Sequence, residues 1–176
     1  YRPKTKGLGN SQVLPRDYVR QAEIELVFRE MAEQVAIRLR RIRKKATRVS
    51  IGLRYSSREN QRPFQAQTTI EPANLTRPLA DTVIGLFRKK YEGGAVRMIS
   101  VYYSGLVDES LTYISLFDDV DCLEKEERLQ SAIDTIRQQF GFTSLLKANA
   151  LSEGSRVIAR SKLVGGHSAG GLDGLS

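Results

Sequence analysis

The chain has 176 residues, of which 40% are hydrophobic and 27% charged, so it can bury a core and is not disordered throughout. Its one cysteine, Cys122, excludes an internal disulfide and a cysteine-rich zinc site, and its one histidine, His167, leaves little material for histidine chemistry. No apolar run reaches the length of a membrane span and no segment resembles a signal peptide, so we expect a cytoplasmic protein without a membrane partner.

The net charge of +8 is unevenly distributed along the chain. Residues 1–107 contain 21 basic and 9 acidic side chains, whereas residues 108–176 contain 7 basic and 11 acidic ones. This division indicates that residues 1–107 bind a polyanion and that residues 108–176 have another role. The alternative is a basic protein that binds nothing acidic, because charge alone is a weak indicator.

The first third of the chain predicts a strand, a long helix and a second strand. Residues 6–14 fit an edge strand that Pro15 ends, and Asp17 is a candidate helix cap. Apolar residues spaced three and four apart predict an amphipathic helix over about 19–44, and we expect its basic stretch 38–48 to be a solvated helix end. Strict alternation then predicts a half-buried strand over 48–56.

The middle of the chain predicts a hairpin, a helix and a strand. Residues 64–70 alternate again after a short polar loop, which is typical of a hairpin partner for the preceding strand. Thr76 is a candidate cap for a second amphipathic helix, which ends near the two glycines at 93–94. Residues 96–107 are rich in β-forming side chains.

The rear part predicts a third helix followed by a glycine-rich tail. Asp121 and Glu124 have the spacing of a capping box at its start. Its apolar stripe consists of Leu129, Ile133, Ile136 and Phe140. We therefore divide the chain into a domain over 1–107, an acidic linker over 108–123, a helical extension over 124–164 and a flexible tail over 165–176.

The order β-α-β-β-α-β predicts an α+β fold, namely a four-stranded antiparallel sheet with both helices on one face. The other face would then be polar and nearly free of acids. We expect it to carry Asn10, Gln12, Ser50, Gly52, Arg54, Gln65, Gln67, Thr69, Ser100 and Tyr102. Such a face can simply contact water, but its lack of acids favours a phosphate-binding surface.

Four segments in this order, "KGLGNSQVLPRDY", "VSIGLRYS", "FQAQTTI" and "VRMISVYYSGLVD", resemble the C-terminal little finger of UmuC-like Y-family translesion DNA polymerases. The resemblance covers about residues 1–107. It implies a sheet that lies along the DNA major groove and grips the primer–template backbone without reading sequence. The implied contacts are Asn10, Ser11, Gln12, Ser50, Gly52, Arg54, Gln65, Gln67, Thr69, Arg97, Ser100 and Tyr102. Ala66 and Met98 stand where arginine is common in relatives, which weakens the expected electrostatic grip.

The segment "YISLF", Tyr113 to Phe117, resembles the bacterial sliding-clamp-binding pentapeptide. Ser115, Leu116 and Phe117 match its usual form, Ile114 replaces a leucine, and Tyr113 replaces the usual glutamine. The resemblance implies that Leu116 and Phe117 form an apolar anchor in a sliding clamp. The alternative is that both side chains pack against the chain's own sheet or third helix.

The function that these features favour is a non-catalytic DNA-binding module of an error-prone translesion polymerase, active in SOS repair of damaged DNA. Its expected partners are primer–template DNA, a sliding clamp and, through the extension, a regulatory protein. The stripe on the third helix could also pair with a second copy. The alternative is an RNA-binding or ribosome-associated α+β module, whose sheet would display several aromatic residues, whereas only Tyr102 is expected on this one.

We predict no catalytic residue, metal ligand or cofactor in this chain. The acids Asp108, Glu109, Asp118, Asp119 and Asp121 flank the clamp-like segment and fit a solvated linker better than a two-metal site. In the family that the chain resembles, magnesium and dNTP are bound by an N-terminal palm, and we expect this chain to begin after it.

Overall fold

The computed structural model describes residues 6–110 and 120–161. Its elements are β1 (Gly7–Tyr18), α1 (Gln21–Arg41), β2 (Lys44–Tyr55), β3 (Phe64–Ala73), α2 (Thr76–Lys90), β4 (Val96–Asp108), α3 (Val120–Phe140), two 3-10 turns (Phe142–Ser144 and Ala148–Leu151) and α4 (Val157–Ser161). None of the described helices is long and apolar enough to cross a membrane.

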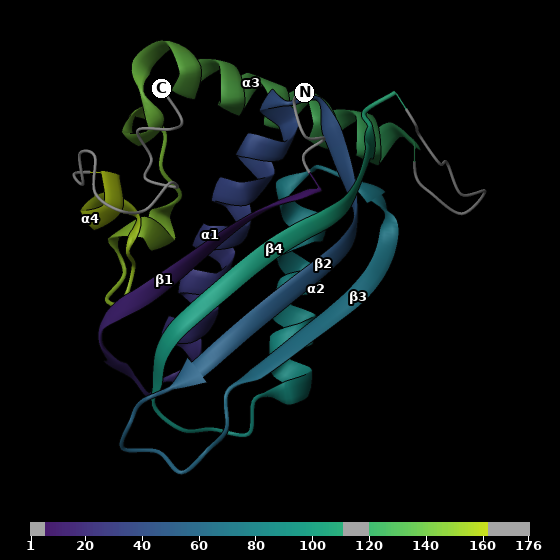
Figure 1. The fold of residues 1–176 in the computed structure, drawn as a ribbon. Helices are drawn as coiled ribbons and strands as arrows, with labels where there is room; N and C mark the ends of the chain where they lie inside the picture. Colours follow the sequence, from purple (N-terminus) through teal and green to yellow (C-terminus); the bar gives the residue numbers. More distant parts are fainter. Residues whose placement is uncertain (1–5, 111–119, 162–176) are drawn as a thin grey trace, which may run out of the picture.

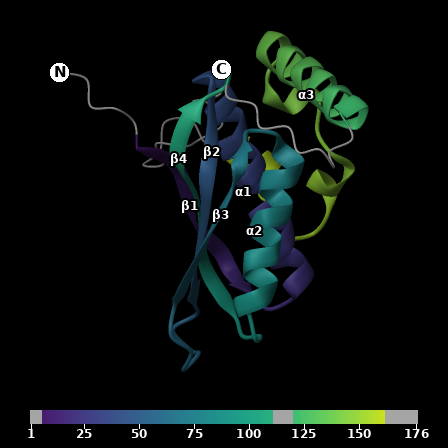
Figure 2. The same ribbon diagram turned by 90° about the vertical axis from the view of Figure 1, so that its right-hand side faces the viewer.

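The four strands form one antiparallel sheet in the order β1-β4-β2-β3. Helices α1 and α2 lie side by side on one face, and no described element covers the other (Figures 1 and 2). The predicted fold class, a four-stranded antiparallel sheet with two helices on one face and a helical extension, is therefore confirmed.

The core lies between the sheet and the two helices, because the apolar stripe of each helix meets the alternating apolar residues of the strands. The rings of Phe28 on α1 and Phe87 on α2 have centroids 5.2 Å apart. Tyr103 of β4 is fully buried and donates its hydroxyl to the Ala32 carbonyl over 3.1 Å. Burial raises the pKa of Tyr103 strongly, so it acts as a neutral hydrogen-bond donor.

The predicted end of the first strand was wrong, because β1 continues past Pro15 to Tyr18. Pro15 lies between Val13 and Tyr18, where the β1–β4 pairing shifts register, and an irregular ladder tolerates a residue without an N–H group. Asp17 is likewise not a helix cap. It accepts a hydrogen bond from Ser56 Oγ at 2.7 Å instead.

The other two predicted caps were also wrong. Thr76 is the first residue of α2, after Leu75, and its hydroxyl oxygen accepts a bond from Arg40 at 3.2 Å. Asp121 lies inside α3, which begins at Val120. In both cases the sequence pattern identified the helix, but its start lies one or two residues from the expected position.

The extension folds back onto the outer side of α1 (Figure 2). Arg40 binds Asp134 of α3 through two bonds of 2.5 and 3.0 Å, so this part of the basic stretch is not solvated as predicted. Arg137 of α3 pairs with Glu33 of α1 at 2.9 Å, with both side chains nearly buried. The extension and the sheet domain are thus joined by polar contacts as well as by the chain.

Candidate nucleic-acid interface

The uncovered side of the sheet, called the open face below, consists of four rows of side chains that cross the strands. Residues paired directly across antiparallel strands project to the same side, so the pairing register defines the rows. From β1 to β3 they are Gly7, Ser104, Arg48 and Thr69; Gly9, Tyr102, Ser50 and Gln67; Ser11, Ser100, Gly52 and Gln65; and Val13, Met98 and Arg54.

The open face brings together nine of the twelve predicted DNA-contacting residues. They are Ser11, Ser50, Gly52, Arg54, Gln65, Gln67, Thr69, Ser100 and Tyr102. Along β2, β3 and β4, the alternating residues predicted to face away from the helices do so. The predicted open-face residues of these three strands are therefore confirmed.

Asn10 and Gln12 were assigned to the wrong face. They pair with Val101 and Ile99, which belong to the core, so both project toward the helices. Asn10 donates to Gln34 of α1 at 3.3 Å. Gln12 accepts a bond from Arg160 of α4 at 2.6 Å. These two amides are polar because they meet polar partners behind the sheet.

Arg97 lies at the edge of the candidate site. It occupies the stretch of β4 where the pairing with both neighbouring strands shifts register. Its guanidinium is 3.7 Å from the Asp17 carboxylate, and its side chain is 44% exposed. Part of its charge is therefore compensated by the chain itself, which reduces what it can offer to a phosphate.

Tyr102 lies flat over β1, at positions where that strand has no side chains. A Cβ at Gly7 would lie 2.5 Å from the Tyr102 hydroxyl oxygen, and a Cβ at Gly9 would overlap the ring. The two glycines are therefore required for space rather than for backbone conformation. The ring remains 43% exposed and forms a flat apolar platform within a polar surface.

Two shallow hollows adjoin this platform. One, of about 530 Å³, is lined by Ser50, Gln65, Gln67, Ser100 and Tyr102. The next, of about 340 Å³, lies around Gly52, Arg54, Gln65 and Met98. Their linings combine hydroxyl and carboxamide groups, which can both donate and accept hydrogen bonds. Such a surface suits the oxygens of a nucleic-acid backbone.

Arginines mark the two ends of the open face, and its four rows contain no acid. Arg48 and Arg54 lie six residues apart on β2, which separates them by about 20 Å at the usual rise per residue. Both are exposed, and neither has an acidic partner among the described residues. Arg48 was not among the twelve predicted contacts, because it closes the basic stretch 38–48, although its place before the following strand left it within reach of a phosphate and it has the same strand phase as Ser50.

Other predicted features fall partly or wholly elsewhere. The clamp-like segment from Tyr113 to Phe117 lies outside the described residues, as do Asp118 and Asp119. Asp108 accepts a bond from Lys44 at 2.5 Å, and Glu109 from Asn74 at 3.0 Å. Within residues 6–110 and 120–161, no three potential metal ligands come together.

These observations define an α+β domain with one sheet face that no described element covers and whose four rows contain no acid. The family model described as "impB/mucB/samB family C-terminal domain" matches residues 5–116, and the chain belongs to this family. The resemblance to the C-terminal part of UmuC-like Y-family polymerases is thereby confirmed.

Curated relatives extend this similarity beyond residue 116. The chain is 36% identical over 160 residues to the "Putative UV-damage repair protein UvrX" of Bacillus subtilis, covering 90% of this chain and 38% of the relative. It is 30% identical over 165 residues to "DNA polymerase IV 2" of Halalkalibacterium halodurans, covering 93% of this chain and 40% of the relative. The chain thus spans about two fifths of the length of these relatives.

Proposed function

We propose that this chain is the non-catalytic DNA-binding module of an error-prone translesion polymerase, acting in the cytoplasm on damaged DNA. The observation that carries the proposal is the open face, whose four rows contain no acid and which has at each end an arginine without an acidic partner among the described residues. In our proposal Arg48 and Arg54 neutralise backbone phosphates, while Gln65 and Gln67 donate to phosphate or sugar oxygens between them. The printed names of the relatives, DNA polymerase IV and UV-damage repair protein, support this choice of ligand.

The test is the affinity of the chain for a fluorescent primer–template, measured by anisotropy over a range of salt concentrations. We expect weak, sequence-independent binding that falls steeply with salt, as for about 3–6 phosphate contacts. Arg48→Ala and Arg54→Ala should each lower the affinity for DNA of every sequence to the same extent. Each should also reduce the slope of log affinity against log salt concentration by about 1. Arg128→Ala removes the same charge from an 80%-exposed residue on α3 and is the control. Equal losses in all three variants would contradict the proposed face.

The alternative, an RNA-binding module, is favoured by one observation, the exposed ring of Tyr102. Aromatic platforms on sheets stack on unpaired bases. The same anisotropy experiment with single-stranded RNA decides between the two. Tighter binding to RNA than to primer–template, lost in Tyr102→Ala, would support the RNA-binding module over the polymerase module.

We further propose that Leu116 and Phe117 dock this module on a bacterial sliding clamp. The support is the match of "SLF" to the clamp-binding pentapeptide, directly after the family domain. Titration calorimetry should give micromolar binding that the double variant Leu116→Ala, Phe117→Ala abolishes. Leu123→Ala, at an exposed leucine on α3, should leave it unchanged. If wild type does not bind a clamp, this part of the proposal fails while the DNA-binding part stands.

The chain alone should incorporate no nucleotides on a primer–template when magnesium and dNTP are supplied. Incorporation that persists after purification to homogeneity would overturn its assignment as a non-catalytic module.

A further inference from the structure

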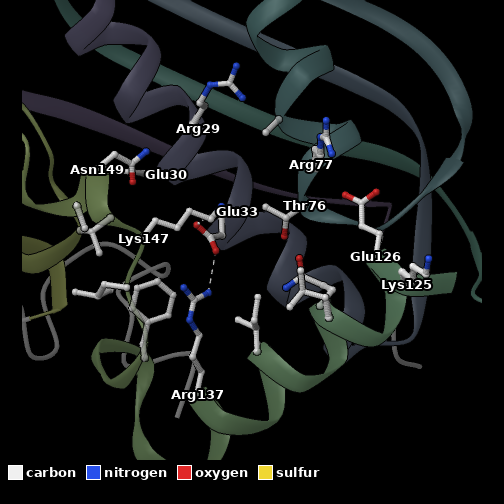
Figure 3. Close-up of a pocket in the computed structure, with 18 of the residues that line it drawn as sticks. Arg29, Glu30, Glu33, Thr76, Arg77, Lys125, Glu126, Arg137, Lys147 and Asn149 are labelled. Atoms are coloured by element: carbon white, nitrogen blue, oxygen red, sulfur yellow. Dashed lines mark hydrogen bonds and ion pairs between the residues drawn. The ribbon is translucent and has the colours of Figure 1, made fainter. Parts of the chain in front are cut away.

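A groove of about 570 Å³ lies on the helix side of the molecule, where α3 faces α1 and α2 (Figure 3). The open face is on the opposite side of the sheet. Apolar side chains from α3 and the following turns form much of the groove lining, namely Leu129, Ile133, Phe142, Leu146, Ala150 and Val157. Leu129 is 62% exposed and Ile133 is half-buried, whereas Ala150 and Val157 form the buried floor, so the described chain leaves the α3 side of this apolar surface uncovered.

The buried acids of the groove wall are already bonded within the chain. Glu33 pairs with Arg137 at 2.9 Å, as the dashed line in Figure 3 shows. Glu30 accepts bonds from Ser155 Oγ at 2.5 Å and from the Arg156 backbone N–H at 2.9 Å. These carboxylates therefore present little free negative charge to a ligand.

The mouth of the groove has an excess of cations. Arg77 and Lys125 are exposed at one end, and neither has an acidic partner within 4.0 Å among the described residues. Lys147 lies at the other end, 55% exposed and 3.3 Å from Glu33 (Figure 3). Of the lining acids in the described chain, Glu126 is the one without a bonded partner.

We propose that this groove binds a short acidic segment of a protein partner. The partner inserts a bulky aliphatic or aromatic side chain against Leu129 and Ile133, and its carboxylates meet Arg77, Lys125 and Lys147. An apolar anchor surrounded by complementary charge is the usual arrangement of a small binding hot spot. The volume lies within the range of about 300–1,000 Å³ that is typical of ligand sites. Because the groove and the open face are on opposite sides, the segment and DNA bind together.

The test is a display selection of random dodecapeptides on the immobilised full chain, followed by polarisation measurements on the fluorescein-labelled winners. The enriched peptides should be net acidic and contain leucine, isoleucine or phenylalanine. Their affinity should fall by about tenfold in Leu129→Glu and in Lys125→Glu. It should rise by about threefold in Glu126→Gln, which removes the unbonded acid at the mouth.

Two variants match these changes outside the groove. Arg128→Glu reverses a charge one turn from Lys125 on an 80%-exposed side chain, and Leu151→Glu places an acid on an 80%-exposed leucine. Both should change the affinity by less than about twofold, and circular dichroism should confirm that all variants are folded.

Several outcomes would overturn the proposal: no enrichment, enrichment of basic or uncharged peptides, or equal losses in the groove variants and their controls. Displacement of the peptides by primer–template DNA would show that they bind at the open face rather than in the groove. Binding that requires removal of residues 162–176 would assign the groove to the chain's own tail. Apart from displacement by DNA, none of these results depends on whether the chain binds DNA, so this inference and the proposed function fail separately.

Discussion

The arginines on the two sides of the sheet differ in whether they pair with acids of the chain. On the helix side, the charges that hold the extension in place are compensated within the chain, because Glu33 pairs with Arg137 and Asp134 with Arg40, whereas Arg77 and Lys125 at the groove mouth have no acidic partner among the described residues. On the open face, Arg48 and Arg54 have no acidic partner among the described residues. The difference separates ion pairs that fix the extension in place from cations that remain available to an external polyanion.

The largest effect on this contrast is expected from Arg137→Ala. The side chain is 7% exposed, and its partner Glu33 is 10% exposed. Removing the arginine leaves a buried carboxylate whose remaining cationic partner, in the part of the chain that the structure describes, is Lys147, and this should lower the free energy of unfolding by about 3 kcal/mol. Chemical denaturation followed by circular dichroism measures the loss.

The matched double variant is Arg137→Met with Glu33→Gln, which removes both charges and keeps the side-chain volumes similar. It should recover most of the lost stability, because the penalty comes from the unpaired charge rather than from the absent pair. A double variant as unstable as Arg137→Ala would show that the main contribution comes from the other contacts of the guanidinium, namely its two bonds to the Leu145 carbonyl and its position 4.5 Å from the Phe142 ring.

On the open face, the strongest structural effect should come from Gly9→Val. The new side chain would occupy the space of the Tyr102 ring and force it off β1. We expect a loss of about 1–2 kcal/mol in stability and a weaker affinity for primer–template DNA. Tyr102→Ala combined with Gly9→Val should restore the stability, because the overlap is then gone. A Gly9→Val chain with normal stability and DNA affinity would mean that the ring has no fixed position.

The neighbours Asn10 and Ser11 test the face assignment directly. Ser11→Glu puts a negative charge on the open face and should weaken DNA binding several-fold, with a stability change within about 0.5 kcal/mol. Asn10→Ala should leave DNA binding unchanged and cost about 1 kcal/mol, because Gln34 loses its donor. DNA binding is measured by anisotropy and stability by urea unfolding. The reverse pattern would show that Asn10, and not Ser11, lies on the open face.

The sequence predicted the sheet and most of the open face because alternation is a local property. In β2, Val49, Ile51 and Leu53 alternate with Ser50, Gly52 and Arg54, so hydrophobicity alone assigns the two faces. In β1 the contrast between the faces is weaker, because the core face carries Asn10 and Gln12 between Leu8 and Leu14, and Val13 lies on the open face. Asn10 and Gln12 are half-buried and bond to Gln34 and Arg160, and these long-range partners cannot be deduced from a local pattern.

The docking of the extension was not predictable for a similar reason. Glu23, Glu30 and Glu33 have the spacing of a solvent-facing stripe on α1, and charged residues on such a stripe are normally exposed. All three are buried and bonded to residues from elsewhere in the chain: Glu23 to Arg16 of β1 and to Arg20 of the loop before α1, and Glu30 and Glu33 to the extension. Long-range polar pairing of this kind leaves no periodic signal in the sequence.

The smallest predicted effect is a pH dependence with opposite signs at two of these glutamates. Burial raises the pKa of Glu30 above its ordinary value of 4.5, and the bonds from Ser155 and Arg156 oppose this shift only in part. Between 4.5 and the raised value, the folded state holds a proton that the unfolded state has lost, so this group contributes less stability as the pH rises through that interval. Glu30→Gln removes the contribution, and the variant should gain stability relative to wild type over the same interval.

Glu23→Gln is the matched control, and its sign is reversed. The hydrogen bond from Arg16 is the main cause that lowers the pKa of Glu23, so this carboxylate stabilises the fold above 4.5 and loses that effect as the pH falls through the lowered value. The variant should therefore be less stable than wild type at neutral pH, with a deficit that closes in acid. Urea midpoints between about pH 3 and pH 8 measure both differences. Parallel trends for the two variants would mean that these glutamates, buried on the same helix, respond to one shared environment rather than to their own partners.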